Sequence, residues 1–456
     1  MHAVTRARPW FFSPDPDCPH LDEALDRVPE RLAGHDPGET IAPLRPTIPV
    51  IAVTGTNGKT TTTRLIAHLV RTGGRIPGWS STDGIFIDGV EVESGDWSGP
   101  GGAARVLADP SVQVAVTETA RGGILLRGVG TAVNDVSVVT NISADHLGLL
   151  GVHTLEQLAE VKSVIVRITR PGGWTVLNAD DPLVRAMRSV SRAKPWFYSP
   201  DPDNPYLDDA LEAGGRAITV LEGTIVILGR GHDPTEVIDL AQVPITLAGA
   251  STVNTANALA ATAAAIAVGV PLDAVREGLR TFTTGAEHNA GRLNVYGLDG
   301  TAVVLDLAHN EASLASLLAV ARALTEPGGE LATVLGTAGD RPDEAIHAMG
   351  ALAARAADRL VVAGRTRYGR GRPAGEMEAI WRAGAAEAGV VDVAEAADEL
   401  GALVALLDAA DPLPAGSCIA VCALEKRVEL AAEIGRRGGA EMTPEQVADR
   451  VRRAAG

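Results

Sequence analysis

The sequence predicts an α/β protein made of two strand–helix domains, and three observations support this prediction. Short runs of β-branched and aliphatic residues alternate with longer stretches that carry apolar residues at helical spacing. One such run, residues 49–53, leads into a glycine-rich turn and then into a helical pattern. The alternating series also breaks near residue 285 and then starts again. Because strands that alternate with helices usually form a mostly parallel sheet covered by helices, we expect two such sheets.

The predicted elements divide the 456 residues into three parts: an N-terminal segment 1–46, a central domain 47–285 and a C-terminal domain 286–456. In the central domain, strands are predicted at 49–53, 112–116, 136–139, 174–177 and 217–221, and helices at 61–70, 155–168 and 256–268. In the C-terminal domain, strands are predicted at 302–306, 332–335, 359–363 and 418–422.

Composition excludes several classes of function. The formal charge of −17 argues against a general nucleic-acid surface, which needs clustered Lys and Arg, but it does not prevent a local glycine-rich loop from binding a nucleotide. Cys18, Cys418 and Cys422 match neither a disulfide framework nor a zinc-site pattern. No stretch approaches the roughly 20 apolar residues of a membrane span, and the N-terminus has no apolar signal core. We therefore expect a cytoplasmic chain with no nucleic-acid partner and no membrane partner.

One segment of the N-terminal part recurs in the central domain. Residues 9–25 begin Pro-Trp-Phe-Phe-Ser-Pro-Asp-Pro-Asp, and residues 195–211 begin Pro-Trp-Phe-Tyr-Ser-Pro-Asp-Pro-Asp. Only one such pair exists, so the chain is not a solenoid. The pattern is typical of an aromatic strand closed by a Pro-Asp turn. A substrate-contacting arm is the alternative interpretation.

The turn Thr-Gly-Thr-Asn-Gly-Lys-Thr at residues 54–60 is the strongest indication of function. A strand that leaves a glycine turn as a helix directs several backbone N–H groups toward one point, at the positive end of the helix dipole. Lys59 can reach the β- and γ-phosphates of a nucleotide, and the Thr60 hydroxyl can bind Mg²⁺. The strict eight-residue Walker pattern needs a glycine where this chain has Val53. The residues expected to bind ATP here are Gly55, Thr56, Asn57, Gly58, Lys59, Thr60 and Thr61.

Two further side chains follow predicted strands of the same sheet. Glu118 comes just after 112–116, and His146 follows 136–139. Because ligands of open α/β sheets bind at the carboxyl ends of the strands, both side chains are expected to face one crevice. The carboxylate of Glu118 is the kind of hard oxygen ligand that suits Mg²⁺. The alternatives are a solvated strand-end carboxylate and a structural, hydrogen-bonding histidine.

Several segments, in order and spacing, resemble the Mur ligase family, most closely the Mur-ligase-like half of cyanophycin synthetase. They are residues 54–60, 82–85, 93–96, 118–125 (Glu-Thr-Ala-Arg-Gly-Gly-Ile-Leu), 141–148, 161–163 and 177–182. The resemblance spans residues 46–435 and implies a P-loop central domain with a mostly parallel sheet, followed by a Rossmann-like α/β domain. The ATP-grasp half of cyanophycin synthetase has no counterpart here, which puts that family's full polymerase activity in question.

The resemblance implies roles for individual residues. The catalytic set would be Lys59, Glu118, His146 and Lys162, and the metal site would use Thr60, Glu118, His146 and Lys162. In many Mur ligases the lysine that matches Lys162 is carbamylated, which turns it into a carboxylate-like ligand for Mg²⁺. Burial that depresses the pKa of a lysine favours such a reaction with CO₂. The alternative for Lys162 is a surface lysine whose stem packs along helix 155–168.

The resemblance also implies nucleotide contacts outside the loop. Asn257 would contact the adenine, Arg292 a phosphate and Asp306 the ribose. A helix cap is the alternative role for Asn257, and Asn254 is itself a candidate cap. The chain departs from the family pattern near these residues, and the packing on the adenine side is therefore in question. The departures are Ala290, Leu307 and Glu311, in place of proline, tyrosine and proline.

The C-terminal domain is expected to recognise the amine substrate through residues 339–341 and 370–376. If the donor is arginine, as in cyanophycin synthetase, then Asp340, Asp343 or Glu376 could pair with its guanidinium. The Arg-rich loop 365–372 could equally grip a carboxylate. Ordinary solvated loops are the third interpretation.

Together these features predict an ATP-dependent ligase that joins a carboxylate to an amine through an acyl phosphate. Mg²⁺ and Lys59 would screen the repulsion between the carboxylate and the triphosphate. The implied acceptor is an amino-acid or peptide carboxylate of the aspartyl type. The alternatives are a folylpolyglutamate-synthase-like ligase and a non-catalytic nucleotide-binding partner of a separate ATP-grasp enzyme. The joint presence of Lys59, Glu118, His146 and Lys162 argues against the second alternative, and a homo-oligomer stays open.

Overall fold

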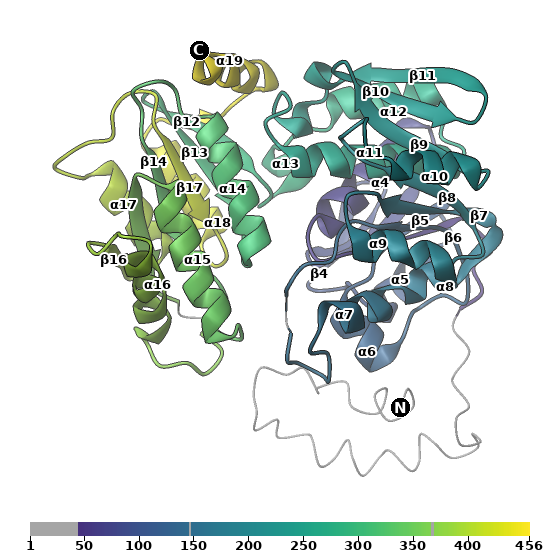
Figure 1. Ribbon diagram of the computed structural model, residues 1–456, viewed down its shortest axis with the longest axis horizontal. Helices are drawn as coiled ribbons and strands as arrows, with labels where there is room; N and C mark the ends of the chain where they lie inside the picture. Colours follow the sequence, from purple (N-terminus) through teal and green to yellow (C-terminus); the bar gives the residue numbers. More distant parts are fainter. Residues whose placement is uncertain (1–43, 146, 366–368) are drawn as a thin grey trace, which may run out of the picture. The chain divides into compact units, whose positions relative to one another are not determined.

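The computed structural model describes residues 44–145, 147–365 and 369–456 (Figure 1). His146, Cys18 and the first copy of the repeat, residues 9–25, therefore lie outside the described residues. The chain divides into two compact units, and each is described by itself. The first contains the described residues up to Ile142, then Leu147–Val237 and Ala256–Gly278, and the second contains Ser143–His146, Ile238–Thr255 and Leu279–Gly456. Residues 143–145, 238–255 and 279–285 thus group with the second unit, although the sequence placed them in the central domain.

The first unit is built on an 11-stranded sheet with the strand order β11-β10-β9-β8-β7-β6-β1-β5-β2-β3-β4. Its strands are β1 (Val50–Thr54), β2 (Pro77–Ser80), β3 (Gly84–Ile87), β4 (Val90–Ser94), β5 (Val114–Glu118), β6 (Asn134–Val139), β7 (Thr169–Asn178), β8 (Lys194–Tyr198), β9 (Arg216–Leu221), β10 (Thr224–Gly229) and β11 (His232–Asp239). The strands from β9 through β2 in this order are parallel, while β3 and β10 pair antiparallel with their neighbours. The carboxyl ends of five of these parallel strands therefore lie at the same edge of the sheet: β8, β7, β6, β1 and β5.

The helices of the chain up to residue 281 cover this sheet. They are α4 (Lys59–Thr72), α5 (Pro100–Leu107), α6 (Arg121–Arg127), α7 (Leu155–Lys162), α8 (Val164–Arg167), α9 (Pro182–Ala186), α10 (Tyr206–Glu212), α11 (Thr252–Ala267) and α12 (Leu272–Thr281), with the short 3₁₀ turn η1 (Met187–Val190). The 3₁₀ turns η2 (Leu240–Gln242) and η3 (Pro244–Thr246) lie in the segment that groups with the second unit. Buried residues of β6, β7 and β8 pack against α7 to α10 in one cluster. The second copy of the repeat forms β8, a turn and α10, so the strand-and-turn prediction is confirmed for that copy.

One local prediction in this region was confirmed in large part, and another was wrong. The predicted helix 155–168 forms as α7 and α8, which are separated by the single residue Ser163; the Ser163 hydroxyl donates to the Glu160 carbonyl at 2.7 Å. Asn254 is not a helix cap, because α11 begins at Thr252 and Asn254 lies inside its first turn. The cap is Ser251, whose hydroxyl accepts the Asn254 N–H at 3.2 Å.

The second unit contains a seven-stranded sheet with the order β16-β15-β14-β17-β13-β12-β18. Its strands are β12 (Asn294–Leu298), β13 (Thr301–Asp306), β14 (Leu331–Leu335), β15 (Arg359–Ala363), β16 (Ala394–Ala396), β17 (Cys418–Cys422) and β18 (Ala440–Glu441), and its helices are α13 (Ala286–Asn289), α14 (Glu311–Ala323), α15 (Asp343–Ala356), α16 (Glu376–Glu387), α17 (Glu399–Leu407), α18 (Arg427–Arg436) and α19 (Pro444–Ala455). The five strands from β16 to β13 are parallel.

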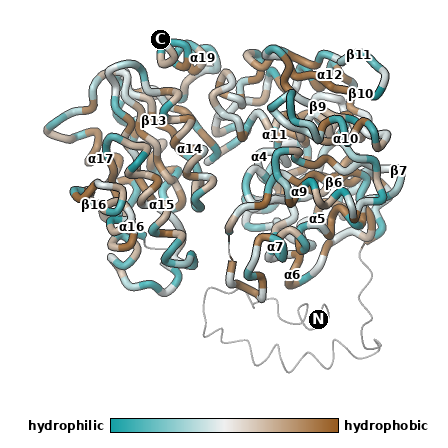
Figure 2. Tube along the Cα trace, in the orientation of Figure 1, coloured by the Kyte–Doolittle hydropathy of each residue, from teal (hydrophilic) through white to brown (hydrophobic). Residues whose placement is uncertain are grey.

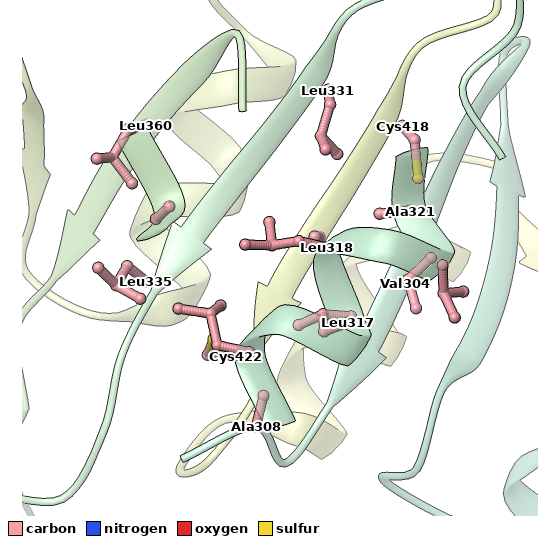
Figure 3. Packing of buried hydrophobic residues seen from close by; sticks show 14 of the residues in the cluster. Val304, Ala308, Leu317, Leu318, Ala321, Leu331, Leu335, Leu360, Cys418 and Cys422 are labelled. Carbon is pink, nitrogen blue, oxygen red and sulfur yellow. The ribbon is translucent and has the colours of Figure 1, made fainter. Parts of the chain in front are cut away.

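Side chains of this second sheet alternate between two buried faces. Val304 packs against α14 in the core that Figure 3 shows, whereas Val303 and Leu305 pack on the other face against α17 and α18. Burial on both faces explains why these strands are continuous apolar runs, which Figure 2 shows as brown segments. Cys418 and Cys422 are free thiols in β17, and burial raises the pKa of each to about 12. Among the described residues, no helix is both long and apolar enough to cross a membrane.

Candidate active site

The glycine-rich turn leaves β1 and becomes α4 at the carboxyl edge of the first sheet. Gly58 precedes the first residue of α4 in the left-handed conformation, with φ of 85°, which favours glycine. A Cβ on Gly58 would lie 2.4 Å from Asn257 Oδ1, and a Cβ on Gly55 would lie 1.8 Å from Thr140 Oγ1. Both glycines are therefore required by backbone shape and by close neighbours. Lys59 folds back over the turn, and its Nζ donates to the Thr56 carbonyl at 2.8 Å.

Asn141, in the loop after β6, holds this turn from the adjacent strand. Its Oδ1 accepts the Asn57 N–H at 2.9 Å, and its Nδ2 donates to the Asn57 carbonyl at 3.0 Å. Its own carbonyl accepts the Thr56 N–H at 2.8 Å, and Thr140 Oγ1 donates to the Asn57 carbonyl at 2.6 Å. The turn is thus bonded to β6 through both backbone groups of Asn57. Sequence reading quoted Asn141 within a family segment but assigned it no role.

Thr60 and Glu118 meet directly, as the sequence predicted for residues of one site. Glu118 is the last residue of β5, and its register partner on β1 is Val53. Thr60 Oγ1 donates to Glu118 Oε2 at 2.9 Å, and both side chains are buried. Thr82 Oγ1 lies 3.4 Å from the Thr60 hydroxyl, which adds a third oxygen to the cluster. Thr61 is buried in the same first turn of α4.

Lys162 lies at the end of α7, and it is buried rather than a surface lysine. Only 3% of its surface is exposed, and Nζ donates to the Gly55 carbonyl at 2.6 Å. The predicted residues Lys59, Thr60, Glu118 and Lys162 therefore gather around the same turn, while His146 lies outside the described residues. Among the described residues, no three His, Cys, Asp or Glu side chains form a metal cluster. A cation here would need a mixed oxygen set, and hydroxyl and carboxylate oxygens fit Mg²⁺.

Asn257, predicted at the adenine, lies against the turn itself. It is 4% exposed on α11, and its Oδ1 accepts the Thr62 hydroxyl at 3.2 Å. The structure therefore places Asn257 beside the glycine-rich turn and away from the start of α11, where a cap would lie.

Arg292 and Asp306 lie together in the second unit, at the carboxyl end of β13. Residues 291–293 form a turn in which Gly291 and Leu293 have φ of 73° and 53°. The Leu293 N–H donates to Asp306 Oδ2 at 2.9 Å. Burial raises the pKa of Asp306 to about 6, against the opposing effects of Arg292, this N–H and His309. The predicted pair is thus one local arrangement built on a backbone conformation that is costly for leucine.

Asn294 organises this turn, and sequence reading missed it. The side chain is 2% exposed, its Oδ1 accepts the Gly291 N–H at 2.6 Å, and its Nδ2 donates to the carbonyls of Thr284 and Asn289. An asparagine at the start of a strand gives no sequence signal of such a role, because its partners are set by the fold.

The loops predicted to recognise the amine are tied together by Arg372. Its guanidinium donates to the carbonyls of Gly339 and Arg341 at 2.7 Å each, to Glu376 Oε1 at 2.6 Å, and pairs with Asp343 at 2.7 Å. Asp343 and Glu376 are therefore already paired with an arginine of the chain. Asp340 pairs with Arg341 at 3.3 Å. Arg372 thus fastens the loop after β14 to the loop after β15.

Comparison with protein-family models identifies two adjacent domains. Residues 53–265 match the Mur ligase middle domain, and residues 291–423 match the Mur ligase, glutamate ligase domain. Together these matches extend over most of the chain and cover both units.

Curated relatives include a cyanophycin synthetase from Synechocystis sp., 45% identical over 315 residues, which are 69% of this chain and 36% of that protein. A UDP-N-acetylmuramoylalanine–D-glutamate ligase from Symbiobacterium thermophilum is 36% identical over 252 residues, which are 55% of this chain and 48% of that protein. The chain thus spans about a third of the length of the cyanophycin synthetase that it matches.

Among solved structures, a bifunctional folylpolyglutamate synthase/dihydrofolate synthase from Yersinia pestis, complexed with AMPPNP and Mn ion, matches with a TM-score of 0.62. The sequence identity is 18%, and the match covers 95% of this chain and 93% of that chain. At this identity the likeness supports the fold, and the predicted α/β plan of two sheet domains is confirmed.

Proposed function

Because the chain belongs to the Mur ligase family, we propose that it is an ATP-dependent ligase that joins a carboxylate to an amine. The single observation that carries the proposal is the turn between β1 and α4, bonded to β6 and adjoining the Thr60–Glu118 pair. This arrangement offers backbone N–H groups and a lysine to a triphosphate, beside oxygen ligands for a cation. A nucleotide in the turn would draw Lys59 from the Thr56 carbonyl to the β- and γ-phosphates.

The residues present also fit a magnesium ion. Thr60 and Glu118 would hold it, with Lys162 as a further ligand if carbamylated, and His146 stays a predicted ligand. Bound Mg²⁺ would neutralise charge on the phosphates during transfer. Lys162 would help by fixing the Gly55 carbonyl and hence the start of the turn.

The chemistry that we propose has two steps. An oxygen of the acceptor carboxylate attacks the γ-phosphorus, the bond to ADP breaks, and an acyl phosphate forms. The amine nitrogen then attacks the acyl carbon, phosphate leaves from the tetrahedral intermediate, and the nitrogen loses a proton. The products are an amide, ADP and phosphate. Lys59 would act in the first step, by stabilising negative charge that moves onto the β–γ bridging oxygen.

For the substrates, we propose an aspartyl-type acceptor on an amino acid or peptide, which is what the resemblance to cyanophycin synthetase implies. The matched cyanophycin synthetase is 45% identical over 315 residues. Asn257, Arg292 and Asp306 are proposed to contact adenine, phosphate and ribose. The folylpolyglutamate-type alternative shares the fold, and the substrate screen distinguishes it.

The test is a screen of the 20 amino acids against short aspartyl peptides and a folate-type acceptor for ADP formation, with product mass as the second readout. We expect sustained ADP formation only when both the acceptor and the amine substrate are present, and a product mass equal to the sum of the two substrates minus water. ATP binding without ADP formation in any combination, folate-type acceptors included, would instead favour a non-catalytic nucleotide-binding partner. Lys59→Ala is the control that identifies contaminating ATPase.

A further inference from the structure

A buried ion pair lies at the carboxyl edge of the second sheet, and it includes Arg365, the first residue of the Arg-rich loop 365–372. Arg365 follows β15, and Glu399 is the first residue of α17. They form a salt bridge, and only 2% of the Arg365 side chain and none of the Glu399 side chain is exposed. Neither residue was singled out in the sequence as an ion pair, because 34 residues separate them.

Glu399 binds the backbone of the loop that follows β17, residues 423–426. Its Oε1 accepts the N–H groups of Leu424 and Glu425 at 2.8 and 3.0 Å. Its Oε2 accepts those of Glu425 and Lys426 at 3.2 and 3.0 Å. One carboxylate therefore sets three consecutive residues, immediately before α18 begins at Arg427.

Hydrogen bonds connect one end of the loop held by Glu399 to Asp306 and the other end to the turn that carries Arg292. At its start, the Ala423 N–H donates to the Asp306 carbonyl at 2.8 Å, since the ends of β13 and β17 are paired. Just beyond its end, Arg427 donates to the Ala290 carbonyl at 3.3 Å. Neither of these two bonds involves Glu399, so the ends of the loop are anchored independently and Glu399 sets the position of residues 424–426 between them.

Arg365 connects the same loop to two others. Its Nη2 lies 3.5 Å from the Cys422 carbonyl, at the end of β17. A Cβ on Gly336, in the loop after β14, would lie 1.1 Å from Nη2, so Gly336 leaves the space that the guanidinium fills. The pair thus joins the loops after β14, β15 and β17, and Arg372 bonds the loops after β14 and β15 at the same edge.

A fully buried ion pair is a poor way to stabilise a domain, because removing two charges from water costs about as much as their attraction returns. We propose that Arg365 and Glu399 are positioning residues for the amine-binding side of the reaction, and that they set the β17 loop against the loops after β14 and β15. This inference rests on the proposed ligase function. The pair would act on the amine step rather than on nucleotide binding in the first unit.

The test compares Glu399→Gln and Arg365→Lys with Glu330→Gln. Glu330 pairs with Arg359 Nε at 2.6 Å, at the opposite end of β15, so the control removes an ion pair from the same strand but from the other edge. Hydrogen exchange of a peptide spanning 418–430 reports whether the β17 loop is held. Steady-state kinetics use the best amine from the ADP screen, starting with L-arginine, and hydroxylamine traps the acyl phosphate independently of that amine.

For Glu399→Gln we expect faster exchange at residues 424–426 and a KM for the amine raised about tenfold or more, since small misplacements of reacting groups are costly. Hydroxylamine-trapped ADP formation should stay near the wild-type rate, and Glu330→Gln should resemble the wild type in every readout. Arg365→Lys should show the same pattern, more weakly. It provides the measurement if Glu399→Gln does not fold.

Unchanged exchange at 424–426, or an equal loss in the amine and hydroxylamine reactions, would overturn the inference while leaving the ligase function intact. A wild-type chain that forms no ADP with any substrate pair would instead overturn the proposed function and, with it, the role of the pair in the reaction.

Discussion

Replacing Asp306 by asparagine should make the second unit more stable at neutral pH but not in acid. Burial raises the pKa of Asp306 from 3.8 to about 6. The folded state therefore binds the proton more tightly than the unfolded state does. Stability is lost as the pH rises through the window from about 4 to about 6, and the loss is complete above it.

The size of the effect follows from the same two values. A difference of about 2 in pKa corresponds to about 3 kcal/mol, and about 2 to 3 kcal/mol of this should appear between pH 4 and pH 7.5. The side-chain amide of the Asp306→Asn variant would keep an oxygen that can accept the Leu293 N–H, so the substitution removes the charge and leaves the turn. The free energy of unfolding of the variant, relative to that of the wild type, should therefore rise by about 2 to 3 kcal/mol from pH 4 to pH 7.5.

Hydrogen exchange of the β13 backbone amides measures this difference in the free energy of unfolding, because it reports opening of the second unit alone. Wild type and variant are compared at each pH, so that intrinsic exchange rates cancel. Asp299→Asn, at an exposed position in the adjoining hairpin turn, is the matched control and should follow the wild type. Equal differences between Asp306→Asn and wild type at pH 4 and 7.5 would show that ionisation of Asp306 carries no cost and would refute the reasoning.

Three further predictions concern the turn in the first unit. Lys59→Ala should lower kcat about 100-fold or more with an unchanged circular dichroism spectrum, and normal phosphate release from this variant would mean that the turn is not the nucleotide site. Lys162→Ala should lose activity that formate or acetate partly restores if the lysine is carbamylated, and a crystal structure with an unmodified lysine in the active, metal-bound enzyme would contradict this. Gly58→Ala should weaken nucleotide binding in calorimetry about tenfold or more, because it adds a clash with Asn257 to left-handed strain of about 1 to 2 kcal/mol. Gly74→Ala has a similar φ of 76° and no atom within 4 Å, so it should show the strain without the binding defect.

The sequence predicted the elements best where strands are buried on both faces. The bounds of β15 and β17 match the predicted 359–363 and 418–422, because continuous apolar runs leave little choice of position. The last three strands at one side of the first sheet, β2, β3 and β4, were missed, since they are short and contain Pro77, Gly78 and Gly84 or exposed polar residues. The break between α7 and α8 is confined to the single residue Ser163, which no periodicity reveals.

For the candidate site, the sequence predicted residues whose type and place on a strand end restrict their chemistry. Glu118 ends β5, and Thr60 lies in the helix that follows β1, the adjacent parallel strand, so their meeting follows from topology. Asn141 could not be assigned in this way, because its role depends on the three-dimensional register between β1 and β6. The Arg365–Glu399 pair depends on the packing of α17 against β15, which is likewise a property of the folded domain.

The bonds from Asn141 and Thr140 to Asn57 have a thermodynamic consequence for ligand capture. A phosphate-binding turn that is already bridged to its neighbouring strand has few backbone torsions left to immobilise when a triphosphate arrives. The conformational entropy of the turn is then lost when the domain folds rather than each time a nucleotide binds. Nucleotide exchange would therefore be governed by the strength of the phosphate contacts and not by slow rearrangement of the turn.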